Sequence, residues 1–522
     1  MPVARIQVLI SSLFSQRFSA YLPELLEQEG LHFARTERVP HPLEVDLLIR
    51  ASDAPTLSEA EVAFLMAGGR LLAFALEQGP AGAARPLPPG HARIDGERLR
   101  FFEGRALPGA DHAHGEAGEP RAPLVQELRV GAGTLLHLSV DVADTVVRLQ
   151  QGHGPVERDL PSAPDGSAET EDGLLKADDG MTLDWLEDRR LTPGGQPYFA
   201  VAAADRWRRW LLQEIVRAVS PLPVARLAYW PAAAPAAFHL SLDSDGNDPA
   251  HAASTLAFLA GLGLRATWCE LEGGYGPELQ RAIHAAGHEV ALHYNALERE
   301  GGRWGGDAFA AQLERHNAQA PARATSNKNH YTRFEGWDEL FAWCDAGGIT
   351  LDGTRGGSKM GNRGFVFGTC HPYRPARADR SGARHALFEL GFLSQDMDLD
   401  AARWGDSSIT GPLLSEVEAV SGCAHLLCHP AHLHAHAPVR DALEAALRLA
   451  RARGFLELTA CEIAAWSRAR RATRLTPRAG GLQVSGAPQG AVLELLRVGS
   501  VRQIPLETPD SFVSLAQEAP HA

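Results

Sequence analysis

An apolar strand that runs into two carboxylates decides the fold: Phe238-His-Leu-Ser-Leu-Asp243-Ser244-Asp245-Gly246-Asn247. Side chains alternate along a β-strand, so Asp243 and Asp245 are expected to face the same way at its end. One carboxylate can hold a metal ion while the other takes a proton from water, as metal-assisted hydrolysis requires. The alternative is that the pair only caps a turn, because Asp-Gly is a common turn sequence.

A second strand downstream ends in a histidine. It follows a helix expected over about Pro277 to Ala286 and has the sequence Gly287-His-Glu-Val-Ala-Leu-His293-Tyr-Asn295. A carboxylate and an imidazole at the ends of two adjacent strands suit a borderline cation. We therefore predict that Asp245 and His293 bind a divalent metal ion, with zinc as the expected ion.

Three further motifs follow in order along the chain: Asn329-His330-Tyr331, Gly348-Ile-Thr-Leu-Asp352-Gly-Thr354 and Leu426-Leu-Cys-His429-Pro430. Together with the two strands above, they resemble the catalytic domain of polysaccharide deacetylases. In that family a strand ending in Asp-Asp-Gly precedes a Gly-His-Glu strand with a metal-binding histidine, and a Leu-x-His-Pro motif closes the domain. The resemblance covers roughly residues 235–470.

The resemblance implies a distorted (β/α) barrel with its active site at the carboxyl ends of the strands. It implies that Asp245 and His293 are metal ligands and that His429 assists the leaving group as a general acid. It also implies substrate contacts from three groove residues: Tyr331, Asn329 and Asp352.

Two positions depart from the family pattern. Ser244 stands where the family has its catalytic-base aspartate, and Leu297 stands where it has a second histidine ligand. Catalytic zinc normally has three protein ligands plus water, so another residue must complete the site. Asp243 can replace the missing base or act as a ligand. His330 can supply a third metal-binding nitrogen, or it can only orient the substrate.

The chain is expected to be α/β, in four parts. Residues 1–151 form an α/β domain similar to the class I glutamine amidotransferase fold in the order of its elements. No cysteine precedes Cys269, so the nucleophile of those enzymes is absent and a structural or ligand-sensing role is expected. Residues 152–220 are expected to form an irregular connector and a helix. Residues 221–472 are expected to form the deacetylase-like (β/α) barrel, and residues 473–522 are expected to form a small β-domain.

Hydrophobic patterning predicts the main elements of the first domain. The expected helices are Phe18 to Glu29 and Ser58 to Ala67, with Ser58 as the N-cap of the second. The expected strands are Ile6 to Ile10, Val45 to Ile49, Arg70 to Phe74 and Thr134 to Val140.

Composition narrows the choice of partner and location. The formal net charge is -14, with acidic residues spread along the chain, which argues against nucleic acid as a partner. No signal peptide is seen, and no stretch approaches the ~20 apolar residues that span a bilayer. We therefore expect a cytoplasmic protein with no transmembrane segment, whose six cysteines are reduced and mostly buried.

The predicted function is a metal-dependent hydrolase of non-peptide carbon-nitrogen bonds that deacetylates an N-acetylated sugar or polysaccharide. In this hypothesis Asp243 deprotonates the attacking water and His429 protonates the departing amine. The alternatives are an allantoinase-like hydrolase of a small amide or ureide, and a catalytically inactive carbohydrate-binding scaffold. The sequence does not define the oligomeric state.

Overall fold

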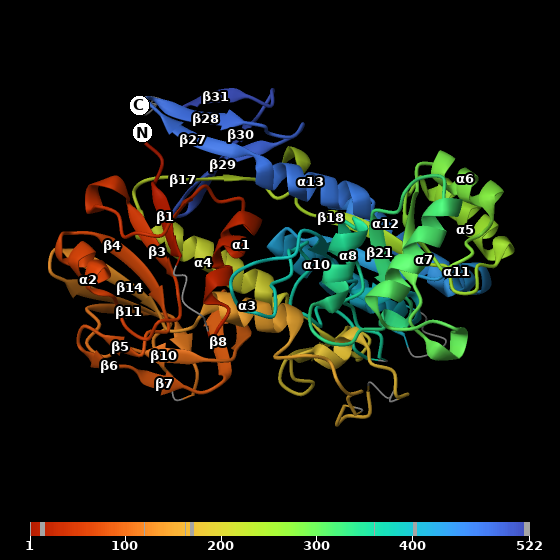
Figure 1. Ribbon diagram of the computed structural model, residues 1–522, viewed down its shortest axis with the longest axis horizontal. Coiled ribbons are helices and arrows are strands. Elements are labelled where there is room, and N and C mark those ends of the chain that lie inside the picture. The colour runs from red at the N-terminus through yellow and green to blue at the C-terminus, as the bar shows by residue number, and fades with distance from the viewer. Residues whose placement is uncertain are drawn as a thin grey trace.

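The protein consists of two large α/β parts and a smaller set of C-terminal strands (Figure 1). The computed structural model describes residues 2–10, 16–119, 121–161, 163–167, 172–359, 361–399 and 405–515. The N-terminal sheet, red and orange, lies at the left of the view, and the second α/β part, green to blue, lies at the right. The C-terminal strands lie above the N-terminal sheet, and both chain ends are found there.

The second α/β part is built on a sheet of nine strands among the described residues, and every pairing in it is parallel. The strands are β18 Ala237–Asp243, β19 Thr267–Glu270, β20 Glu289–Tyr294, β21 Ser326–Asn329, β22 Leu351–Asp352, β23 Phe388–Glu389, β24 Ser394–Gln395, β25 Cys423–Cys428 and β26 Leu456–Glu457. Residues of β18, β19, β20, β21 and β25 are all buried, as expected for a parallel sheet covered on both faces.

The sheet curls, because residues 388–395 link its two edges. β23 at the start of this segment pairs with β22, whereas β24 at its end pairs with β25. Between them, the amide of Leu393 donates a hydrogen bond to the carbonyl oxygen of His425 at 2.8 Å. The prediction of a parallel, barrel-like arrangement is confirmed at this level. Because the sheet curls, the carboxyl ends of strands that are far apart in sequence meet at one end of it.

Helices surround this sheet and follow its strands. They are α5 Pro249–Leu262, α6 Pro277–Ala285, α7 Gly306–Gln319, α8 Glu339–Gly347, α9 Asp396–Leu399, α10 Thr410–Val420, α11 Pro430–Ala435, α12 Ala437–Ala452 and α13 Ala460–Ala472. A short 3₁₀ helix at Pro231–Ala233 precedes β18, and others lie between these helices at Glu298–Glu300, His330–Thr332 and Ser407–Ile409.

The N-terminal sheet has seven strands in the order β11-β13-β14-β4-β3-β1-β2, and the pairings from β2 to β14 are parallel. The strands are β1 Ile6–Ile10, β2 Ala34–Thr36, β3 Leu47–Ala51, β4 Arg70–Phe74, β11 His112–His114, β13 Val125–Val130 and β14 Gly133–Leu138. Short strands that the sequence did not predict lie between β4 and β13: β5 Gln78–Gly79, β6 Gly82–Ala83, β7 Arg85–Leu87, β8 Gly90–Ile94, β9 Glu97–Phe101, β10 Gly104–Ala106 and β12 Glu116–Ala117.

The predicted helices of this part are present. They are α1 Leu22–Gln28, which follows a 3₁₀ turn at Ser19–Tyr21, and α2 Glu59–Met66. The same part also contains α3 Val142–Gln151 and a 3₁₀ turn at Pro42–Glu44. Ser58 caps α2 as predicted: its hydroxyl accepts from the amide of Glu61, whose carboxylate accepts from the amide of Ser58. The amidotransferase-like assignment of this part stays a prediction.

The connector packs against the second α/β part. It contains a 3₁₀ turn at Ala177–Gly180, strands β15 Arg189–Leu191 and β16 Pro197–Phe199, and helix α4 Ala203–Ala218. Backbone bridges join Val156 to Gly336 and Lys176 to Arg333. The connector, which was expected to be an irregular link, is therefore also packed against the second α/β part.

The C-terminal strands form two small sheets. β27 Arg474–Arg478, β28 Gly481–Ser485 and β31 Ser511–Ser514 make one, while β17 Val224–Leu227, β29 Val492–Arg497 and β30 Ser500–Pro505 make the other. Among the described residues, no helix combines the length and apolar character needed to cross a membrane. All six cysteines are free, five of them are buried, and Cys461 is half-buried.

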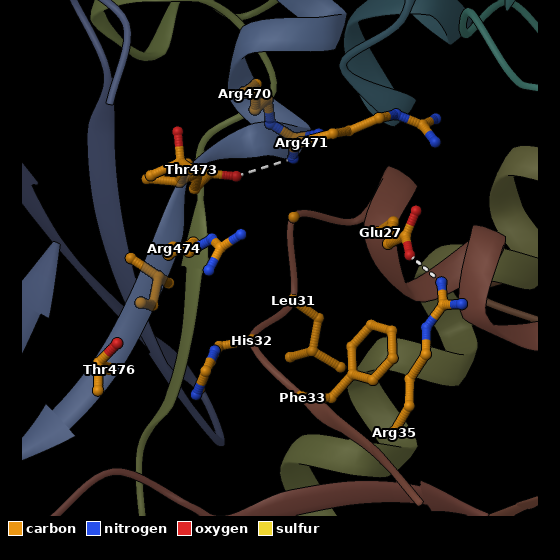
Figure 2. Close-up of a pocket in the computed structure, with 13 residues that line it drawn as sticks. Glu27, Leu31, His32, Phe33, Arg35, Arg470, Arg471, Thr473, Arg474 and Thr476 are labelled. Atoms are coloured by element: carbon orange, nitrogen blue, oxygen red, sulfur yellow. Dashed lines mark hydrogen bonds and ion pairs between the residues drawn. The ribbon is translucent and has the colours of Figure 1, made fainter. Parts of the chain in front are cut away.

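A cavity of about 370 Å³ lies where the N-terminal part meets α13 and β27 (Figure 2). Its wall is rich in arginine, but partners within the protein hold several of these side chains. Arg470 donates to the backbone carbonyls of Leu227, Ala228 and Gln28 at 2.7 to 2.9 Å. Arg35 pairs with Glu27. The cavity is part of the junction between sheets and contains none of the predicted site residues.

A buried ion-pair network fastens the N-terminal part to the rest. Glu29, just after α1, lies 2.9 Å from Arg208 of α4 and 3.1 Å from Arg226 of β17. The side chains of Glu29 and Arg208 are each only 1% exposed. Burial raises the pKa of Glu29, but the charges of Arg208 and Arg226 outweigh this effect and hold it below its usual value. Glu29 therefore stays ionised between the two guanidinium groups, which also pair with Asp205 and Glu494.

We expect Glu29→Gln to lower the free energy of unfolding by about 3–5 kcal/mol, because it leaves buried guanidinium charge without its carboxylate. Urea denaturation followed by circular dichroism measures the change. The control is Glu37→Gln, since Glu37 is exposed beyond the end of β2. A loss for Glu29→Gln no larger than that of the control would contradict this account of the junction.

Candidate active site and metal centre

Ionisable side chains gather at the carboxyl ends of four strands of the curled sheet. Asp243 ends β18, and Asp245 lies in the turn that follows. His293 comes from the end of β20, and His330 follows β21 directly. His429 follows β25. The predicted placement of the two aspartates with His293 and His429 at one end of the sheet is confirmed, and His330 joins them.

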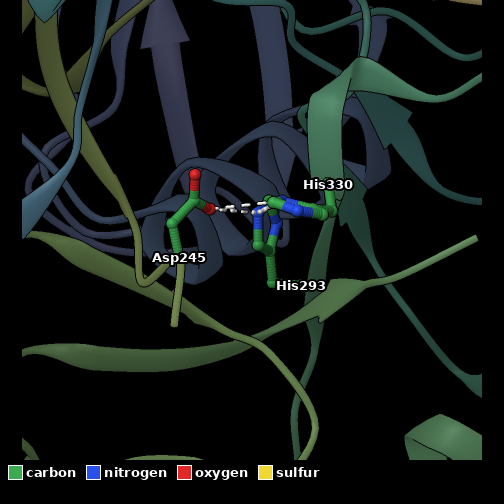
Figure 3. Close-up of side chains that lie close together, drawn as sticks. All are labelled: Asp245, His293 and His330. Carbon is green, nitrogen blue, oxygen red and sulfur yellow. Dashed lines mark hydrogen bonds and ion pairs between the residues drawn. The ribbon is translucent and has the colours of Figure 1, made fainter. Parts of the chain in front are cut away.

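Three of these side chains point their donor atoms at one another (Figure 3). Asp245 Oδ1 lies 3.4 Å from His293 Nε2 and 3.2 Å from His330 Nδ1. The two imidazole nitrogens are 3.2 Å apart. His330 thus lies beside His293, within reach of a shared metal ion, and its role as a metal ligand stays a prediction.

The outer partners of both imidazoles set which nitrogens carry lone pairs. His293 Nδ1 lies 2.8 Å from the carbonyl oxygen of Lys328, to which it donates. His330 Nε2 lies 3.2 Å from the carboxylate of Glu300. With those nitrogens protonated, the nitrogens that face Asp245 are acceptors, as is the carboxylate itself. Three acceptors so close together need a proton or a cation between them.

The spacing of the cluster fits a metal ion. Three ligands that each lie about 2.0–2.1 Å from a tetrahedral zinc ion are roughly 3.3 Å from one another. The observed separations are 3.2, 3.2 and 3.4 Å. Asp245 Oδ1 is also buried without a hydrogen-bond donor of good geometry. Asp245, His293 and His330 can therefore hold a divalent ion while leaving a fourth position for water or substrate.

The electrostatics of Asp245 favour its charged form. Burial raises the pKa of this carboxyl, but its close contacts with His293 and His330 and the charge of His429 together hold it well below its usual value. A metal ligand must be deprotonated to bind. Asp245 meets this condition throughout the neutral range.

Asp243 lies beside the cluster with a different partner. Its Oδ2 is 3.1 Å from the ammonium of Lys328 and 3.8 Å from His293 Nε2. Its Oδ1 has no hydrogen-bond partner, and the residue lines the cavity described below. Lys328, whose side chain is 1% exposed, thus holds one oxygen of Asp243 and leaves the other without a hydrogen-bond partner.

His429 approaches the cluster from the opposite side and is held by Asp396. Its Nε2 is 3.6 Å from Asp245 Oδ2, and its Nδ1 is 3.0 Å from Asp396 Oδ2. Burial lowers the pKa of His429, but the charge and hydrogen bond of Asp396 raise it to about 9 overall. At neutral pH this imidazole carries a proton that it can donate.

A cavity of about 380 Å³ opens onto Asp243, Asp245, His330 and His429. The connector contributes Asp172 and Lys176 to its wall, and the other lining residues are Tyr331, Thr332, Ser358, Phe392, Gln395, Met397, Leu427, Ala431 and His432. Its size falls within the range of small-molecule sites.

The turn after His330 is strained. Tyr331 and Thr332 have φ angles of 56° and 49°, in the left-handed region that side chains other than glycine rarely adopt. This turn puts the Tyr331 ring, which is 42% exposed, against the His330 ring at a centroid distance of 4.6 Å. Consecutive strained residues are a feature of functional sites, where the surroundings hold them in place.

Two of the predicted substrate-binding residues lie beneath the site. Asn329 is fully buried, and its amide donates to the carbonyl oxygen of Arg333 at 2.8 Å. Asp352 is also fully buried and accepts from Asn327 at 2.7 Å and from Thr354 at 2.9 Å. Neither of them lines the cavity, whereas Tyr331 does.

The two departures from the family pattern have structural explanations. The Ser244 hydroxyl accepts from the amide of Leu271 at 3.0 Å, and Leu297 is 1% exposed within the protein. Neither side chain takes part in the cluster. His330 instead supplies the second imidazole.

Sequence reasoning missed three supporting residues: Lys328, Glu300 and Asp396. Lys328 directly precedes the motif Asn329-His330-Tyr331, and this position in the sequence was the signal that could have identified it. Asp396 lies 33 residues before His429 and meets it only because β24 pairs with β25. Glu300 belongs to a 3₁₀ turn with no motif of its own.

No protein-family model matches the sequence, and a search of curated protein sequences gives no significant match. Among solved structures, a proposed polysaccharide deacetylase from Mycobacterium smegmatis is 17% identical, with a TM-score of 0.37 over 46% of this chain and 93% of that one. Puue allantoinase is 13% identical, with a TM-score of 0.35 over 48% and 95%. A family 4 carbohydrate esterase from Streptomyces lividans, in complex with acetate, is 16% identical, with a TM-score of 0.28 over 43% and 92%. The chemical interpretation rests on the site itself.

We expect the chelator-treated protein to bind zinc tightly through Asp245, His293 and His330. His330→Gln should weaken this binding by about 100-fold or more, since loss of an outer partner alone typically costs about 10–100-fold. Isothermal titration calorimetry with zinc measures the affinity. His284→Gln, at an exposed position of α6, is the control and should bind as the unmodified protein does. Equal affinity in the His330 variant would remove this residue from the site.

Proposed function

We propose that this protein is a metal-dependent hydrolase that cleaves the carbon-nitrogen bond of an acetamido group. The observation that supports this most strongly is the arrangement around Asp245. A cluster able to hold a metal faces one of its oxygens, and a protonated histidine faces the other. A site of this kind can stabilise negative charge on a carbonyl oxygen and supply a proton to a leaving group within a few ångströms.

A divalent ion held by Asp245, His293 and His330 supplies Lewis acidity and lowers the pKa of a coordinated water. The side chains then divide the remaining work. Asp243, which lines the cavity, accepts a proton from the attacking water through Oδ1, the oxygen that has no hydrogen-bond partner in the protein. Lys328 holds Oδ2 at 3.1 Å, so the carboxylate keeps one orientation.

His429 serves as the general acid. Amines are poor leaving groups unless they are protonated, and His429 Nε2 lies 3.6 Å from Asp245 Oδ2, the oxygen that does not face His293 and His330. Asp396 keeps the imidazole in place through Nδ1 and raises its pKa to about 9, so the proton is present at neutral pH. The proton accepted by Asp243 and the proton given by His429 balance the hydrolysis of one amide to an acid and an amine.

The substrate class we favour is an N-acetylated amino sugar. The cavity mixes aromatic and apolar walls from Tyr331, Phe392 and Met397 with polar groups such as Gln395 and Lys176. A sugar ring presents the same combination of apolar faces and hydroxyl edges. A small ureide has few apolar faces to use these walls, so it is the second candidate.

Asp243→Asn should lower kcat by about 10²- to 10⁴-fold while zinc affinity stays unchanged, because a general base typically contributes this much and Asp243 is not a ligand in this proposal. The assay is acetate release from N-acetylated oligosaccharides by zinc-loaded protein, with calorimetry of zinc binding in parallel. Arg281→Gln, an exposed change on α6, serves as the control.

The assay also separates the competing functions. Hydrolysis of allantoin or simple amides in place of acetylated sugars would favour a ureide or amide hydrolase. Zinc binding with no hydrolysis of any of them would favour a carbohydrate-binding scaffold and contradict the proposed chemistry.

A further inference from the structure

A second group of metal-binding side chains lies next to the first. Asp396 Oδ2 is 3.0 Å from His429 Nδ1, and Asp396 Oδ1 is 2.9 Å from His432 Nδ1. The three donor atoms all lie within 4.8 Å of one another. One carboxylate and two imidazoles are the same ligand types as those of the first cluster.

The local fold presents these donors together. His429 is the N-cap of α11, and His432 lies in its first turn, so the two imidazoles three residues apart project from one side of the helix. Their rings lie 5.2 Å apart, centroid to centroid. Asp396 is fully buried beneath them and also accepts from the backbone amide of His429. His432 is 23% exposed and lines the cavity, which gives an ion a way in.

The present distances are also those of hydrogen bonds. Two occupants can therefore satisfy Asp396: protons on the Nδ1 atoms of His429 and His432, or a divalent cation that replaces these protons. A borderline ion such as zinc suits two nitrogens and a carboxylate better than calcium or magnesium do. The proton and the ion must compete for the same atoms.

We propose that a second zinc-class cation binds to Asp396, His429 and His432 when the metal is in excess, and that it inhibits the hydrolase. The inhibitory part rests on the proposed function, whereas the binding part does not. An ion on His429 Nδ1 replaces a proton there, so the imidazolium no longer forms. The hydrogen left on Nε2 is far less acidic than that of an imidazolium, and the leaving amine loses its proton donor.

Calorimetry with zinc tests the binding. The unmodified protein should show a tight site and a weaker second site. His432→Gln should keep the tight site and lose the weaker one, and His330→Gln should weaken the tight one. His434→Gln is the matched control on the same helix, since His434 contacts Ser254 and lies outside the cluster. Cobalt replacing zinc should show the same two equivalents in its visible absorption.

Kinetics test the consequence. The ratio of the rate at one equivalent of zinc to the rate at excess should reach about 100 in the unmodified protein, the scale of a general acid's contribution. The ratio should fall near one in His432→Gln, whatever the absolute rate of that variant.

The outcomes separate the two proposals. A single zinc site in the unmodified protein, or a second site that His432→Gln leaves unchanged, would overturn this inference while leaving the proposed function intact. Two sites in a protein without hydrolase activity would support the second metal site and refute its inhibitory role together with the proposed function.

Discussion

The structure depends on a single electrostatic constraint: three hydrogen-bond acceptors meet at the end of a parallel sheet, and a proton or a cation must lie between them. Asp245, His293 and His330 are 3.2 to 3.4 Å apart, and partners behind the two imidazoles orient them toward the carboxylate. Without positive charge between them they repel each other. The curled sheet makes the arrangement possible, because it brings the ends of β18, β20 and β21 together, and β25 pairs directly with β18.

Much of the fold follows from local sequence patterns. The strands Ile6–Ile10 and Arg70–Phe74 begin and end where alternation and glycine punctuation place them, and Ser58 caps its helix. The short antiparallel strands between β4 and β13 were not predicted, because segments of two to five residues carry too little periodicity to stand out. The connector was expected to be irregular, but its contribution to the cavity wall depends on long-range packing that no local pattern encodes.

In the candidate site, too, some features follow from local sequence and others depend on long-range packing. The strand period predicted that Asp243 and Asp245 point the same way. The expectation that His293 ends an adjacent strand was wrong, because β19 lies between β18 and β20, but the side chain of His293 still reaches Asp245. The resemblance placed the next histidine at the position of Leu297, whereas the second imidazole beside Asp245 belongs to His330, which follows β21. Two consecutive residues with positive φ follow His330, and this strained turn could not be read from the ordinary residues Tyr331 and Thr332. Asp396 is likewise positioned by strand pairing across the sheet.

The most direct test of the central claim is zinc X-ray absorption spectroscopy on protein loaded with one equivalent of zinc. The account predicts four nitrogen or oxygen ligands at about 2.0–2.1 Å, with outer-shell scattering from two imidazoles. Asp245→Ala and His330→Gln should each change this spectrum. A spectrum dominated by sulfur near about 2.3 Å, or one without imidazole scattering, would contradict the assignment of the metal centre.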